Sequence, residues 1–150
     1  INYFKNLGPD PFEKDFNFKY VKKYLCKKNK NIKNTLLDQK FLSGVGNIYA
    51  SEILNYSKIN PLKPSSKLKS KEIKKIIFYT KKILIRSIKK GGTTIKNFLS
   101  VKGHKGSYQK EFRAYDREGR RCKNNLCLGT IIKVNLSKRS TYMCNICQKK

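Results

Sequence analysis

Hydrophobic residues recur at helical spacing along the first 92 residues of this chain. The first such stretch opens with Asp10-Pro11-Phe12-Glu13. Here the aspartate can cap a helix, the proline suits its first position, and the glutamate can reach back to the cap amide. Apolar residues three or four positions apart then mark one face of the helix. That face is expected to comprise Phe16, Tyr20, Val21 and Leu25.

Further helices are predicted on both sides of a glycine turn. A short helix over residues 36–41 breaks at Gly44-Val45-Gly46, and Asn47 begins the next one. Ser70 is expected to cap the longest helix, which ends at Gly91-Gly92. Its apolar face is expected to include Ile73, Ile76, Ile77, Leu84 and Ile88.

The helical period disappears beyond residue 92. Glycines within residues 93–106 predict a loop, and Phe112–Tyr115 and Ile131–Val134 are expected to form short strands. The sequence therefore predicts a mainly α fold, in which a helical domain is followed by a small β-hairpin module. The expected divisions are a linker over 1–9, a helical domain with its loop over 10–109, and the module over 110–150.

The charge balance points to a polyanionic partner. The 150 residues include 36 Lys and Arg against 9 Asp and Glu, a formal net charge of +27. A chain rich in Lys, Asn and Ile together carries a compositional bias that inflates this excess. The remainder still favours nucleic acid over a membrane or an acidic protein. No apolar stretch approaches the ~20 residues that span a bilayer, and there is no signal-peptide pattern. Ile1 in place of Met leads us to expect a cut amino terminus.

Four of the five cysteines lie near the end of the chain, as two closely spaced pairs in the sequence. Four residues separate Cys122 from Cys127, and two separate Cys144 from Cys147. Two pairs of thiolates on tight turns suit the tetrahedral preference of Zn²⁺, and a module this small needs a metal to fold. Disulfides or free thiols are the alternative, but the crowding favours one structural zinc ion in a reducing cytoplasm. Cys26, remote from the others, is expected to be a buried apolar residue.

These motifs, taken in order, resemble the bacterial formamidopyrimidine-DNA glycosylase family over nearly the whole chain. The run Gly-Asn-Ile-Tyr-Ala-Ser-Glu is more similar to this family than to its relative endonuclease VIII. One departure is the first cysteine pair, which has four intervening residues where the family has two. The segments that carry the resemblance are 36–39, 44–52, Asn60-Pro61, 91–94, 115–119, 139–142 and 144–148.

The resemblance implies a helix-two-turn-helix domain, a zinc finger and a base-excision function. Family members remove oxidised purines, such as 8-oxoguanine and formamidopyrimidines, and then cleave the abasic strand. The nucleophile is an amino-terminal proline amine. This chain has neither that proline nor the domain with the family's catalytic lysine, so we expect a DNA-binding half that is inactive alone. The implied partner is double-stranded DNA with an oxidised purine or an abasic site, bound by a monomeric, cytoplasmic bacterial protein.

The resemblance also assigns roles to individual residues. Asn47 would hold a phosphate beside the flipped base. Arg139, at the tip of the zinc hairpin, would grip neighbouring phosphates and is the family's proton donor in δ-elimination. A permanently charged guanidinium is a poor proton donor, so electrostatic positioning would be the larger part of that catalytic role. Lys30 would correspond to a basic DNA contact, with Lys28 and Lys33 as alternatives.

Further DNA contacts are expected from Tyr49, Thr93, Thr94 and Tyr115, although packing explains Tyr115 equally well. The loop over 93–106 would close over the extruded base, and its only histidine would be an ordinary loop residue. Two alternatives remain at this point. One is a non-catalytic zinc-ribbon protein that binds nucleic acid, and the other is a paralogue that binds damage without cutting.

Overall fold

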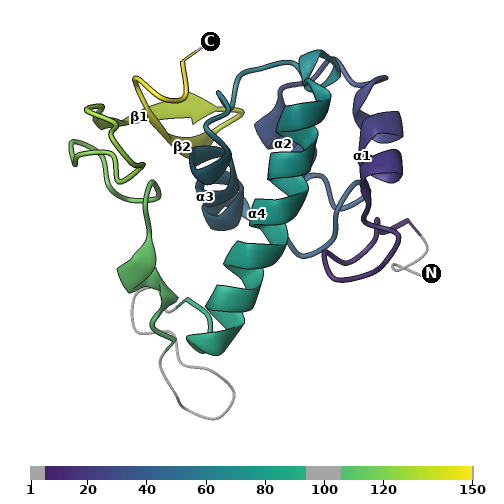
Figure 1. The fold of residues 1–150 in the computed structure, drawn as a ribbon, viewed down its shortest axis with the longest axis horizontal. Helices are drawn as coiled ribbons and strands as arrows, with labels where there is room; N and C mark the ends of the chain where they lie inside the picture. Colours follow the sequence, from purple (N-terminus) through teal and green to yellow (C-terminus); the bar gives the residue numbers. More distant parts are fainter. Residues whose placement is uncertain (1–5, 94–105, 150) are drawn as a thin grey trace.

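The computed structural model describes residues 6–93 and 106–149, which form four α-helices followed by a two-stranded antiparallel hairpin (Figure 1). This confirms the mainly α fold with a small β-hairpin. The α-helices are α1 (Phe18–Leu25), α2 (Ile32–Leu37), α3 (Asn47–Ser57) and α4 (Ser70–Lys89). The strands are β1 (Ile131–Leu136) and β2 (Arg139–Cys144), and two 3₁₀ helices span Ser65–Lys67 and Tyr108–Glu111. None of the helices in these ranges is long and apolar enough to cross a membrane.

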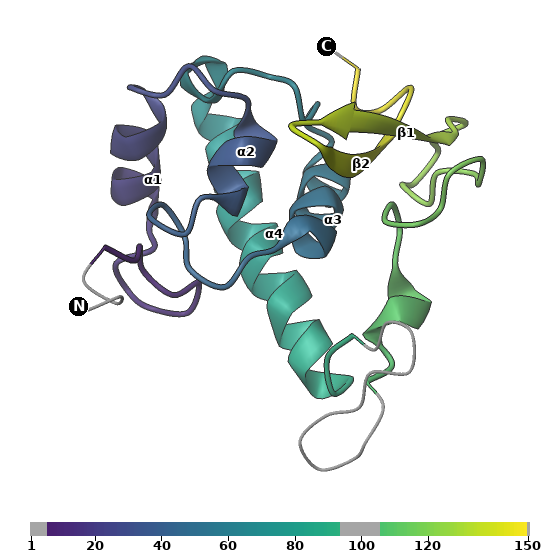
Figure 2. The same ribbon diagram turned by 180° about the vertical axis from the view of Figure 1, so that it is seen from behind.

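Helix α3 is the centre of the molecule. It packs against α2, α4 and β2, and it lies between the hairpin and α4 (Figure 1 and Figure 2). Its residues are buried nearly all round, including the polar Ser51, Glu52 and Asn55. A helix surrounded in this way is expected to lack a polar face, and its buried polar groups need partners.

The buried side chains form two clusters. The larger one lies among the four helices and extends to Tyr108 and Phe112. The smaller one comprises Ala114, Cys122, Ile131, Tyr142 and Cys144. The hairpin module therefore has little apolar surface of its own, and two of its five buried members are cysteines.

The predicted start of the first helix is wrong by several residues. The side chain of Asp10 accepts from the Phe12 amide at 2.8 Å, so it closes a local turn and does not cap a helix. Turns continue to Asn17, whose side chain accepts from the Tyr20 amide at 2.9 Å and caps α1. These turns carry Phe16 into the core, where its ring packs edge-on against Phe41.

The strand predicted over Phe112–Tyr115 is absent, because a side chain takes its amides. The Glu52 carboxylate accepts from the backbone N–H groups of Arg113, Ala114 and Tyr115 at 3.0–3.1 Å. Those donors would otherwise form a β ladder. The strand predicted at Ile131 is confirmed and continues to Leu136.

The remaining elements agree with the prediction apart from small shifts. The helix predicted over 36–41 is an exception, because α2 covers Ile32–Leu37 and shares only residues 36 and 37 with it, although Phe41 is still buried. Lys69 is the cap of α4, with Ser70 as its first residue. Cys26 is exposed, which corrects the expectation of a buried apolar residue, because it follows the last turn of α1.

Candidate functional site

The turn between α2 and α3 leaves the start of α3 open. Gln39 braces this turn, since its side chain accepts from the Gly44 amide at 2.8 Å and donates to the Val45 carbonyl at 3.1 Å. Gly44 has φ +86°, a conformation that favours glycine. Helix α3 begins at Asn47, as predicted, and no side chain caps it. Its first amides are therefore available to an anion.

Asn47 and Lys33 converge on the hairpin. The Asn47 side-chain amide donates to the Ser140 carbonyl at 3.0 Å, and the Lys33 amine donates to the same carbonyl at 3.3 Å. The Lys33 amine also donates to the Thr141 hydroxyl at 2.5 Å. Arg139 is the residue before Ser140. The structure thus brings Asn47, Arg139 and Lys33 to one place, although more than ninety residues of sequence separate the hairpin from the other two.

Lys33 is a buried cation. Its side chain is 0 % exposed, and burial followed by the positive charge of Arg139 lowers the pKa of Lys33 from 10.5 to about 8. In the described part of the chain, no carboxylate forms an ion pair with Lys33 or Arg139. Burial of a cation without a counter-ion is costly, and such a cost marks a candidate anion-binding site.

The hairpin turn places Arg139 at this site. Ser137 and Lys138 have φ of +49° and +65°, as in a two-residue type I′ turn. The Asn34 side chain of α2 donates to the Ser137 hydroxyl at 3.0 Å, which ties the turn to the helical domain. Arg139 follows directly, pairs with Leu136 across the hairpin and is exposed. Its guanidinium is therefore free to meet a partner beside the buried Lys33.

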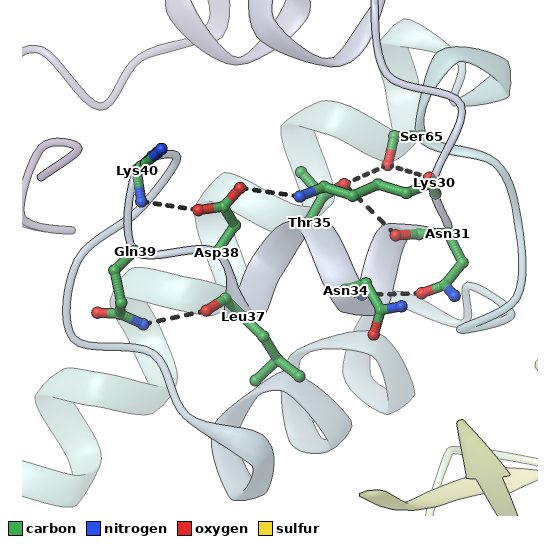
Figure 3. A network of polar contacts seen from close by, with 9 residues as sticks. All are labelled: Lys30, Asn31, Asn34, Thr35, Leu37, Asp38, Gln39, Lys40 and Ser65. Atoms are coloured by element: carbon green, nitrogen blue, oxygen red, sulfur yellow. Dashed lines mark hydrogen bonds and ion pairs between the residues drawn. The ribbon is translucent and has the colours of Figure 1, made fainter. Parts of the chain in front are cut away.

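Lys30 lies in a different environment (Figure 3). Its amine forms an ion pair with Asp38 at 2.8 Å, and its backbone carbonyl accepts from the Ser65 hydroxyl at 2.9 Å. The hydrogen bond from Lys30 is the main reason that the pKa of Asp38 lies below its ordinary value. Lys28 lies over the Tyr24 ring at 5.0 Å. Of the three lysines considered from the sequence, Lys33 is the one beside Asn47.

The aromatic and threonine candidates contact other parts of the protein. The Tyr49 hydroxyl is 2.5 Å from the Ser87 hydroxyl and 3.1 Å from that of Thr93, at the end of α4. Tyr115 packs edge-on against Tyr142 of the hairpin, with ring centroids 5.0 Å apart. Their contacts with DNA stay predictions. Thr94 and most of the 93–106 loop lie outside the described residues.

The four cysteines form one cluster that can hold a metal ion. All four sulfurs lie within 4.8 Å of one another. Cys122 and Cys147 are 3.7 Å apart, and Cys127 and Cys144 are 3.5 Å apart. In a tetrahedron with metal–sulfur distances of about 2.3 Å, neighbouring sulfurs are about 3.8 Å apart. The donor set therefore fits a tetrahedral thiolate site.

Backbone amides around the cluster also suit thiolates. The amides of Gly129 and Ile146 point to the sulfurs of Cys127 and Cys144 at 3.4 and 3.3 Å. A Cβ at Gly129 would lie 2.4 Å from the Cys144 sulfur, so only glycine fits there. Burial raises the pKa of Cys127, but hydrogen bonds from the Gly129 amide and the neighbouring thiols outweigh burial and lower this pKa to about 7.

Three comparisons with known proteins point to the same family. Residues 7–99 match the model of the formamidopyrimidine-DNA glycosylase H2TH domain. The chain is 41% identical over 148 residues to the formamidopyrimidine-DNA glycosylase of Zymomonas mobilis, and 44% identical over 149 residues to that of Prochlorococcus marinus. Each alignment covers 99% of this chain but only 54% and 52% of the relative. The chain thus spans about half the length of these relatives.

Solved structures show the same fold. A mutant of the Lactococcus lactis FPG protein, in complex with DNA that contains Fapy-dG, superposes with a TM-score of 0.90 at 34% identity. The MutM (Fpg) protein of Thermus thermophilus superposes with a TM-score of 0.90 at 29% identity. The two superpositions cover 97% of this chain and 52% and 55% of the respective structures.

Proposed function

This chain belongs to the formamidopyrimidine-DNA glycosylase H2TH domain family, and from that premise we propose that it grips duplex DNA at an oxidised purine or an abasic site. The observation that carries the proposal is the cluster of Lys33, Asn47 and Arg139, which has no carboxylate counter-ion in the described part of the chain. A DNA phosphate supplies the missing negative charge.

The arrangement offers a phosphate two kinds of donor. The uncapped first turn of α3 and the Asn47 amide offer neutral donors, while Lys33 and Arg139 offer positive charge. Contacts of this kind fix the position of a strand without reading its sequence. Bound phosphate would also raise the pKa of Lys33 toward its ordinary value, so that binding above about pH 8 takes up a proton.

In the whole enzyme, we propose that these residues serve base excision and strand cleavage by holding the backbone still. Arg139 would orient the phosphates during elimination, and its permanent charge would stabilise the negative charge that develops there. These 150 residues span about half the length of the relatives, and the first proline among them is Pro9. We therefore expect this chain alone to bind DNA but not to form a borohydride-trapped adduct.

We propose that the metal is one zinc ion, held by Cys122, Cys127, Cys144 and Cys147. Four protein thiolates leave no open position, so the ion's contribution is to fix the module that presents Arg139. We propose that Tyr49, Thr93 and Thr94 contact the DNA.

Binding of a duplex with one abasic-site analogue, followed by fluorescence anisotropy across a salt series, tests the DNA-binding proposal. Loss of the Asn47 side chain removes one hydrogen bond to a charged group, so Asn47→Ala should cost about 1.5 to 3 kcal/mol. Arg139→Ala should weaken binding and flatten the salt slope by about one unit. The matched control is Lys133→Ala, which removes an exposed charge from the same hairpin. If Arg139→Ala changes DNA affinity and its salt slope no more than this control does, the Arg139 side chain does not bind the DNA.

A further inference from the structure

The Asn124 side chain joins the cysteine cluster to helix α3. Asn124, in the turn between the first two cysteines, is 7 % exposed. Its side-chain nitrogen donates to the Asn55 carbonyl at 2.9 Å and to the Cys147 sulfur at 3.2 Å. The same amide group thus contacts a metal-ligating sulfur and the DNA-binding helix.

Both acceptors can take this hydrogen bond. The Asn55 carbonyl, in the last turn of α3, accepts from the Lys58 amide at 3.1 Å, and its second lone pair accepts from Asn124. A sulfur that carries negative charge is stabilised by a hydrogen bond, and groups of this kind around a metal orient its ligands and raise its affinity. Because Asn124 is buried, its two bonds are little screened by water.

A second buried amide strengthens the same junction. The Gln148 side-chain oxygen accepts from the Cys144 amide at 2.8 Å and from the Asn55 side chain at 2.9 Å. Its nitrogen donates to the Ile59 carbonyl at 3.0 Å. Asn55 is therefore held by the module through both its carbonyl and its side chain. At the other end of α3, Asn47 contacts the Ser140 carbonyl of the hairpin.

We propose that Asn124 is a positioning residue that locks the four-cysteine site to the carboxyl end of α3. With Asn47 at the amino end, this lock fixes α3 against the hairpin at two points, so that Arg139 is held in register with Asn47. The consequence for DNA rests on the proposed function. The link between Asn124, the metal site and α3 does not.

Asn124→Asp tests this link, because it keeps the shape of the side chain but removes both donated hydrogen bonds. Asn125→Asp is the matched control, since Asn125 is the next residue of the same turn, is exposed and gains the same charge. Zinc release from the loaded chain to a colorimetric chelator, and hydrogen exchange of α3 amides, are measured for both variants. Zinc release should quicken about 10-fold or more for Asn124→Asp only. Exchange in the last turn of α3 should rise in the same variant, while exchange in α1 stays unchanged.

Equal zinc release and equal α3 exchange in the two aspartate variants would overturn the proposal. If Asn124→Asp does not fold, Asn124→Ser is compared with Asn125→Ser, since serine is too short to reach both acceptors and adds no charge. Duplex DNA affinity is measured separately in excess zinc. Failure of every variant and of the wild type to bind DNA would reject the proposed function, and the zinc and exchange results would still decide the role of Asn124.

Discussion

Lys33 illustrates how a residue proposed to bind phosphate can reduce the stability of the free protein. Its folded-state pKa is about 8 and its ordinary value is 10.5, so the charged form is destabilised by folding. Below pH 8 the full penalty applies. Between pH 8 and 10.5 the unfolded chain binds more protons than the folded one, and stability rises with pH until the penalty disappears. In the proposed complex with DNA, bound phosphate would compensate for this cost.

Lys33→Met should therefore separate stability from binding. At pH 7 the variant should have a higher midpoint of thermal unfolding than the wild type, by a few degrees for a gain of about 1 kcal/mol. The difference should shrink toward pH 10.5, and DNA affinity at pH 7 should fall. Circular dichroism melts at the two pH values and an anisotropy titration check this. A variant that is less stable at both pH values and binds DNA normally would contradict it.

The hairpin turn contains backbone strain at Lys138. Lys138 has φ +65°, where a side chain is disfavoured by about 1 to 2 kcal/mol. Lys138→Gly relieves this strain, although glycine also gains freedom in the unfolded chain, and the net stabilisation should be about 1 kcal/mol by urea unfolding. Lys133→Gly, in the middle of β1, should instead destabilise the protein. If Lys138→Gly does not increase the free energy of unfolding, the positive φ of Lys138 costs the folded protein little.

At the scale of elements, Glu52 of α3 holds the segment that leads into the hairpin module. It is fully buried and accepts from three consecutive backbone amides. Burial raises the pKa of Glu52 even though these amides act in the opposite direction. The charge itself therefore costs free energy, and the useful property of the side chain is its acceptor oxygen.

Glu52→Ala should destabilise the protein far more than Glu52→Gln. Alanine leaves buried amides without an acceptor, which costs about 1 to 3 kcal/mol for each one that water does not reach. Glutamine keeps one acceptor oxygen and removes the buried charge, so its stability should stay within about 1 kcal/mol of the wild type. Urea unfolding at pH 7 compares the two. Equal losses would mean that the charge, and not the acceptor, holds the segment.

Local sequence signals predicted the elements that local interactions decide. Helices α3 and α4 follow from apolar spacing and from the glycines beside them, and β1 from its apolar run. The strand expected over Phe112–Tyr115 failed because Glu52, some sixty residues earlier, takes its amides. The same limit applies to the site. Motifs identified Asn47, Arg139 and the cysteines as candidates. No local pattern reveals that Lys30, before α2, pairs with Asp38, whereas Lys33, within α2, contacts the hairpin.

For the whole molecule, the net charge of +27 predicts strongly salt-dependent binding. If four to six phosphates are neutralised, the slope of log K against log salt should be about −4 to −5. Lys33 and Arg139 would contribute two of these cations, and the others must come from exposed lysines. Anisotropy titrations from low to moderate salt measure the slope. A slope near zero would show that most of the charge reflects composition and not a DNA-binding surface.

Removal of the metal should separate the two parts of the molecule. The helices share a large apolar cluster, whereas the module's buried cluster has five members, two of which are cysteines. The contribution of the proposed zinc ion should therefore be local, and a chelator under reducing conditions should unfold the module while the far-ultraviolet helical signal stays largely unchanged. DNA affinity should fall, because Arg139 loses its place beside Asn47 and Lys33. Added zinc should restore both module and affinity, and Cys144→Ser should reproduce the metal-free state. Metal analysis that finds no zinc in the reduced protein, or helices that melt together with the module, would contradict this division.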